Sequence, residues 1–128
     1  MFTRVQSSKT VNAQFTRAGT FADMLSRYVR ERGGDAPAIY TAARIDRRTY
    51  SSIVSNPFRP VSKRTAVQFA FALRLTRQEA DELLRSAGFA LSPSIPEDIV
   101  FAEALADGVR DLQIVSERLY ERGIKAIR

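Results

Sequence analysis

The hydrophobic residues of this chain recur every three or four positions from residue 20 onwards, with polar residues between them. This spacing is typical of helices that bury one face, and no alternation after residue 20 convincingly indicates a strand. With their caps included, we expect seven helices, spanning about 20–33, 35–45, 46–56, 62–73, 76–88, 96–107 and 111–122. The pattern therefore predicts an all-α protein.

Polar residues suited to capping stand at the predicted helix starts. The expected N-caps are Thr20, Asp35, Asp46, Ser62 and Thr76. Thr76 is followed three residues later by Glu79, which together form the pattern of a capping box. These residues make the predicted boundaries more specific than the hydrophobic spacing alone.

The helix predicted over residues 63–73 differs from the others because it is apolar on two sides. Phe69 and Phe71 lie about 200° apart around a helix with 3.6 residues per turn. A helix that is hydrophobic on both sides is expected to be buried on both sides. We therefore predict that this helix is the central element of the domain.

Charge is distributed unevenly along the chain. Residues 1–77 contain 14 Lys and Arg against 4 Asp and Glu, whereas residues 78–128 contain 6 against 10. A basic half joined to an acidic half indicates a surface that binds a polyanion. Of the 20 basic residues, 17 are Arg, whose planar guanidinium suits phosphate and guanine, although a GC-rich genome explains that ratio equally well.

The composition argues against most enzyme classes. The chain has no Cys and no His, so the usual thiolate nucleophile, the usual general base and the commonest metal ligands are missing. The acidic pairs Asp81–Glu82 and Glu97–Asp98 fall in early helical turns, where they suit the helix dipole. We expect no catalytic site, no metal and no cofactor.

No segment has the features of a membrane span or a signal peptide. The longest apolar stretch, 66–73, is short and is interrupted by Gln68, and the first twenty residues lack an apolar core. We expect a cytoplasmic protein. Residues 1–19 contain three cations and no acid, which is consistent with a basic arm or with a short hairpin.

The segment from Ala42 to Ile53 has the spacing of a helix-turn-helix motif. Small Ala42 and Ala43 permit close packing, Ile45 fills the turn and Asp46 caps the second helix. Here the sequence resembles the lambda-repressor-like (Xre-type) DNA-binding domain, over about residues 20–91. It is closer still to a bacterial subgroup of that family, through the runs 45–48, 55–57, 62–66, 70–73 and 83–92.

This resemblance implies a five-helix lambda-repressor-like helix-turn-helix domain over 20–91. The last two helices that the apolar spacing predicts would form a C-terminal helical pair within 92–128. The resemblance also implies that the helix opening at Asp46 reads the major groove of duplex DNA. The residues implied to read bases are Arg47, Arg48 and Ser52. Those implied to contact phosphates are Thr49, Ser51, Arg59, Lys63 and Arg64.

The same resemblance implies a transcriptional regulator that binds DNA as a homodimer, with half-sites about one helical turn apart. We expect residues 92–128 either to assist dimerisation or to dock on the five-helix core. Apolar positions in this segment, such as Ile124 and Ile127, are expected to be exposed. This segment is also a candidate site for a protein partner.

Two positions depart from the family pattern. Arg44 occupies the turn position that usually holds Gly, and the helix after Asp35 begins with Asp35-Ala36-Pro37-Ala38, where related proteins often have a Gln or Ser that holds a phosphate. These departures, together with the uneven charge, leave a second hypothesis open. In that hypothesis the same fold is a protein-interaction module, such as an adaptor, an antitoxin or a phage-encoded inhibitor.

Overall fold

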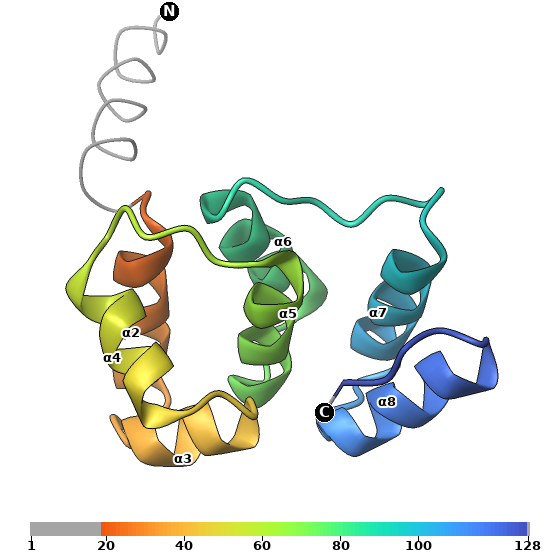
Figure 1. The fold of residues 1–128 in the computed structure, drawn as a ribbon, viewed down its shortest axis with the longest axis horizontal. Coiled ribbons are helices and arrows are strands. Elements are labelled where there is room, and N and C mark those ends of the chain that lie inside the picture. Colours follow the sequence, from red (N-terminus) through yellow and green to blue (C-terminus); the bar gives the residue numbers. More distant parts are fainter. Residues whose placement is uncertain (1–18, 128) are drawn as a thin grey trace, which may run out of the picture.

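The computed structural model describes residues 19–127, and this part of the chain forms seven α-helices and no strand. The helices are α2 (Phe21–Glu31), α3 (Ala36–Ala42), α4 (Arg47–Ser55), α5 (Lys63–Ala72), α6 (Arg77–Ser86), α7 (Pro96–Ala106) and α8 (Leu112–Glu121), as Figure 1 shows. The predicted all-α class is confirmed. The arm or hairpin predicted for residues 1–19 lies outside the described residues except for Gly19.

The capping residues that the sequence indicates are the ones the structure uses. The side chains of Thr20, Asp35, Asp46 and Ser62 each accept a hydrogen bond from the backbone N–H three residues later. The capping box at Thr76 is complete in both directions. Helix boundaries in this chain are therefore determined by local hydrogen bonding, which short-range sequence patterns capture well.

Helix α5 is the centre of the fold, as its two apolar sides predict. It lies between the α2–α4 group and the α7–α8 pair in Figure 1, and it contacts α3, α6 and α8. Its residues from Ala66 to Phe71 are all buried. The Phe69 ring lies 6.2 Å from the rings of both Phe21 and Tyr50, and so joins α5 to α2 and α4.

The C-terminal helices belong to the same hydrophobic core as the first five. Helix α7 packs on α6 and α8 packs on α5, and Val100, Phe101 and Leu119 are fully buried in the shared core. The sequence interpretation was wrong about Ile124 and Ile127, which it expected to be exposed. Ile127 is 5% exposed and Ile124 is partly buried against the core, because the chain turns back after α8.

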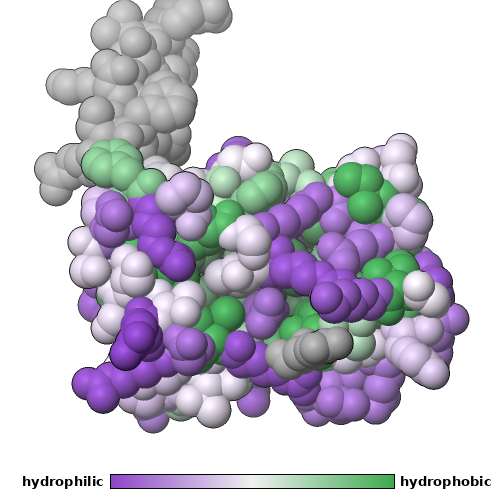
Figure 2. All heavy atoms as spheres, in the orientation of Figure 1, coloured by the Kyte–Doolittle hydropathy of each residue, from purple (hydrophilic) through white to green (hydrophobic). Residues whose placement is uncertain are grey.

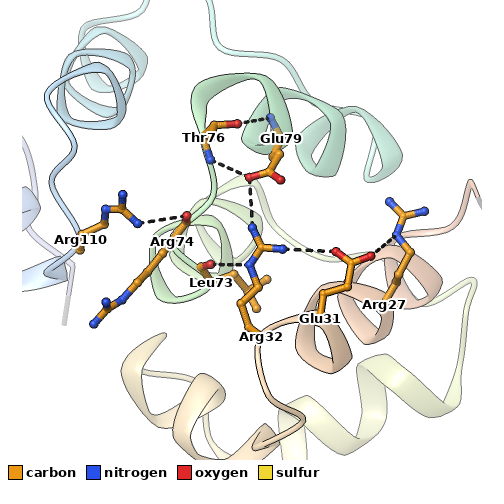
Figure 3. Close-up of polar contacts among 8 residues, drawn as sticks. All are labelled: Arg27, Glu31, Arg32, Leu73, Arg74, Thr76, Glu79 and Arg110. Atoms are coloured by element: carbon orange, nitrogen blue, oxygen red, sulfur yellow. Dashed lines mark hydrogen bonds and ion pairs between the residues drawn. The ribbon is translucent and has the colours of Figure 1, made fainter.

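A cluster centred on Arg32 ties α2 to the junction between α5 and α6 (Figure 3). Its guanidinium donates to the carbonyl of Leu73 at 3.1 Å and to a carboxylate oxygen of Glu79 at 3.2 Å. It also lies over the Tyr28 ring, 5.1 Å from the centroid. Arg32 thus fixes the end of α2 against two helices that are distant in sequence.

The outer surface on the side drawn in Figure 2 is mainly hydrophilic, with hydrophobic residues in small separate areas. Between residues 19 and 127, no helix is both long enough and apolar enough to cross a bilayer.

Candidate nucleic-acid interface

The turn between α3 and α4 is short and tightly held. Ala43 is completely buried, and the N–H of Ile45 donates to the carbonyl of Tyr40 at 2.9 Å. Arg44 has a φ of 61°, in the left-handed region where a residue with a Cβ costs about 1 kcal/mol relative to glycine. The departure from Gly noted in the sequence is therefore a real strain on this turn.

Gln68 anchors this turn from behind, a role that the sequence interpretation missed. Its side-chain amide on α5 donates to the carbonyl of Ala43 at 2.7 Å, and Gln68 itself is only 9% exposed. The signal in the sequence was a single polar residue inside an otherwise apolar helix. Buried polar groups are nearly always hydrogen-bonded, so a lone glutamine at such a position indicates a specific partner.

The inner side of α4 is fixed by aromatic and aliphatic contacts. Ile53 is 1% exposed, and the ring of Tyr50 lies 5.2 Å from that of Tyr40 on α3. Burial raises the pKa of Tyr50, and the neighbouring Tyr40 adds to the rise. This packing determines which side of α4 faces outwards.

The outer side of α4 presents Arg47, Arg48 and Ser51, all of them exposed, while Thr49 and Ser52 are partly buried. Within the part of the chain that the structure describes, the guanidinium groups of Arg47 and Arg48 form no ion pair and no side-chain hydrogen bond. The pKa of Asp46 is lowered, mainly by hydrogen bonds from Thr49 and to a smaller extent by the charge of Arg48.

The two cations at the start of α5 have a different environment from those on α4. Lys63 forms an ion pair with Asp98, and Arg64 forms one with Glu97, both on α7. Asp98 is 1% exposed and also accepts from the backbone N–H of Ser92 at 2.8 Å. The sequence interpretation placed phosphates at Lys63 and Arg64, whereas the structure places the chain's own carboxylates there.

Further bonds connect this region to the end of the chain. Arg64 donates to the carbonyl oxygens of Lys125 and Ala126, the latter at 3.1 Å. Arg44 donates to the carbonyl of Ile127 at 3.0 Å and to the side chain of Gln113 at 3.2 Å. The sequence contained no signal for these contacts, because their acceptors are mostly backbone carbonyls.

Arg59, also assigned to phosphates, lies in the loop between α4 and α5. It is partly buried and lines a hollow of about 270 Å³ that Thr20, Phe21 and Phe58 also border. Phe58 is 85% exposed, an unusual state for a phenylalanine, and the sequence interpretation did not single it out.

Taken together, the structure brings Arg47, Arg48, Thr49, Ser51 and Ser52 onto one helix and directs Lys63 and Arg64 towards α7. The exposed groups of α4 are hydrogen-bond donors and hydroxyls, suited to acceptors on an anionic partner. Within residues 19–127, no group of three acidic residues is arranged to hold a metal ion.

Comparison of the chain with protein-family models, with curated proteins and with solved structures returned no match. The resemblance to lambda-repressor-like domains therefore stays a prediction from the sequence.

Proposed function

We propose that this protein is a transcriptional regulator that binds duplex DNA through the outer face of α4. The observation on which the proposal depends is the pair Arg47 and Arg48, two exposed guanidinium groups in the first turn of that helix. Each can donate two hydrogen bonds to the N7 and O6 atoms of a guanine in the major groove. Ser52, one turn later, is the third proposed base contact.

The arrangement of helices supports this proposal. Helices α3 and α4 are joined by a short turn, α3 also packs on α5, and α4 packs on α2. We assign α2 to α6 as a five-helix lambda-repressor-like domain, with α3 and α4 as its helix-turn-helix motif. In this assignment the buried side of α4 holds the helix rigidly while the outer side enters the groove.

The proposed phosphate contacts are fewer than the sequence suggested. Thr49, Ser51 and Arg59 stay in the proposal, whereas Lys63 and Arg64 are paired with α7 in the structure. Phosphate contacts supply most of the sequence-independent affinity. We therefore expect affinity for random DNA to be modest.

A homodimer would place two copies of α4 in successive half-sites. Ile114 and Tyr120 of α8 are 42% and 78% exposed, but they lie about 120° apart around the helix, and we propose the side that carries Tyr120 for this contact. The mass of the protein in solution, by light scattering with and without Tyr120→Ser, tests the dimer separately from DNA binding.

The central experiment is selection of bound fragments from random duplexes, followed by affinity measurements on the selected site by fluorescence anisotropy. Arg47→Ala and Arg48→Ala should each weaken binding to the selected site by about 10-fold to 100-fold, since a bidentate contact with guanine discriminates by ~1–3 kcal/mol. Binding to random duplexes should fall much less, because reading contacts are specific to sequence.

A matched control changes two other exposed arginines, Arg30 and Arg85, which lie in the last turns of α2 and α6. Arg30→Ala with Arg85→Ala removes the same charge as Arg47→Ala with Arg48→Ala. If both double variants lose the same affinity, general charge explains the binding and α4 does not read the sequence. If no duplex is bound at low salt, the proposal is wrong.

The second candidate function is a protein-interaction module, and the exposed side chain of Phe58 favours it. Exposed aromatic residues beside a hollow often anchor protein contacts. Binding to heparin and random DNA across a salt series separates the two candidates, because polyanion binding weakens steeply as salt rises. Absence of retention at about 50 mM salt would favour the protein-interaction module.

A further inference from the structure

The bonds between the two halves of the chain concern the very cations that flank α4. Arg44 precedes α4 in the turn, and Lys63 and Arg64 follow the loop after it. Their partners are Glu97 and Asp98 on α7, Gln113 on α8 and the backbone carbonyls of residues 125–127. We call Glu97, Asp98 and residues 125–127 the C-terminal latch.

We infer that the C-terminal latch is autoinhibitory: it holds Lys63 and Arg64 away from DNA phosphates, ties down Arg44 at the turn before α4 and so restrains the binding by α4. This inference rests on the proposed function. It also gives a role to the ion pairs that hold Lys63 and Arg64 against α7.

While the latch is closed, the bonds within it use four of the five N–H groups of Arg64 and leave one for a phosphate. Its Nε donates to Glu97 at 2.9 Å, its Nη1 donates to the carbonyl of Ala126, and its Nη2 donates to Glu97 and to the carbonyl of Lys125. All three nitrogens are therefore engaged. A bidentate contact with a phosphate requires that the latch opens at this residue.

Arg44, at the other end of α4, is held less completely, by two bonds to neutral acceptors, and its side chain stays exposed. Both of its Nη atoms donate, one to Ile127 and one to Gln113. Ile127 is in turn held by Ser116, whose hydroxyl donates to the Ile127 carbonyl at 3.0 Å and accepts from its N–H at 3.2 Å. These bonds all use backbone groups of Ile127, whose side chain packs in the core, so loss of that packing is expected to loosen the carbonyl that Arg44 contacts without altering any charge.

Closing of the latch and binding of DNA oppose each other, because both use the N–H donors of the same cations. A ligand shifts an equilibrium between two states only through contacts that differ between them, and a bidentate contact of a phosphate with Arg64 would form in the open state alone. Opening the latch must then raise affinity for DNA, and DNA must loosen the latch by the same factor.

The test compares Glu97→Gln with Glu103→Gln by anisotropy on the selected duplex at several salt concentrations. Glu103 is a matched control on the same helix, because it pairs with Arg122 at the surface and its replacement alters net charge equally. Freeing one cation for a phosphate should raise affinity about tenfold near ~0.1 M salt and steepen the salt dependence by about one unit. Glu103→Gln should leave both within about twofold of the wild type.

A second variant, Ile127→Ala, opens the latch with no change of charge and should also raise affinity. Circular dichroism checks that each variant keeps its helices. In the wild type, amide hydrogen exchange at residues 125–127 should become faster when DNA is added, since phosphates displace the latch.

The outcomes separate the latch from the proposed function. If the wild type binds through Arg47 and Arg48 but Glu97→Gln and Ile127→Ala bind no better than Glu103→Gln, the latch is wrong and the proposed function stands. If neither the wild type nor any variant binds DNA, both are wrong. Equal gains in the Glu97 and Glu103 variants would show a general charge effect, which also overturns the latch.

Discussion

Replacement of Gln68 offers a sharp test of how the α3–α4 turn is held in place. The substitution Gln68→Met keeps the length and approximate volume of the side chain but removes the amide donor. The carbonyl of Ala43 then loses its bond of 2.7 Å. No backbone N–H within the described residues replaces it as a donor, and Ala43 is 0% exposed, so water cannot reach the residue readily.

The expected loss follows from leaving one buried acceptor without a partner, which costs about 1–3 kcal/mol. Part of this is offset because the thioether of Met is itself favoured in a buried position. We therefore expect the free energy of unfolding to fall by about 2 kcal/mol, which lowers the Tm by roughly 6–12 °C for a domain of this size.

Urea denaturation followed by circular dichroism measures this change. The matched control is Gln78→Met on α6, an exposed glutamine whose replacement should change the unfolding free energy by less than about 0.5 kcal/mol. Gln68→Glu should be worse than Gln68→Met, because a carboxylate would face the carbonyl. If Gln68→Met is as stable as Gln78→Met, the bond to Ala43 does not hold the turn and our reasoning about it fails.

Three further changes test the hydrogen-bonded ends of the helices. Thr76→Ala removes one half of the capping box and should reduce the unfolding free energy by about 1 kcal/mol, as measured in urea. The pKa of Glu79 is lowered by the backbone N–H of Thr76 and by Arg32. The ionised Glu79 therefore stabilises the fold fully above the ordinary pKa of a glutamate, and this stabilisation is lost as pH falls through the lowered pKa. An acid titration of Tm should show this loss in the wild type but not in Glu79→Gln. Arg74 has a φ of 57° and an exposed side chain, so Arg74→Gly should raise stability by up to about 1 kcal/mol, and a lower Tm would contradict the strain that we assign to it.

Local signals in the sequence predicted the helices of this protein well. Thr20, Asp46 and Thr76 are recognisable as caps because each acts on a backbone group three residues away. The two apolar sides of α5 were equally readable, since burial on both sides follows from the spacing of Phe69 and Phe71. These features depend on neighbours in sequence, which a single chain reveals.

The candidate site was only partly predictable, because its electrostatics depend on contacts across the fold. Lys63 and Arg64 lie in the first turn of α5, where cations are disfavoured unless an anion lies nearby, and the resemblance found in the sequence implied a DNA phosphate there. The sequence could not show that Glu97 and Asp98, more than thirty residues away, supply that anion. The contacts of Arg44 were less predictable still, because one of its acceptors is a backbone carbonyl, which no residue type marks.

Helices α4 and α5 begin alike, and the difference between them is the best support for the proposed function. Each has two consecutive cations in its first turn, an arrangement that opposes the helix dipole by about 0.3–1 kcal/mol per charge at an exposed position. On α5 this cost is relieved by two carboxylates of α7. On α4 the described residues give Arg47 and Arg48 no ion pair, and only the exposed Asp46, which caps the helix, acts on Arg48 through its charge. A local arrangement that the fold compensates only in part is expected where function requires it, and an anionic partner would supply to α4 what α7 supplies to α5.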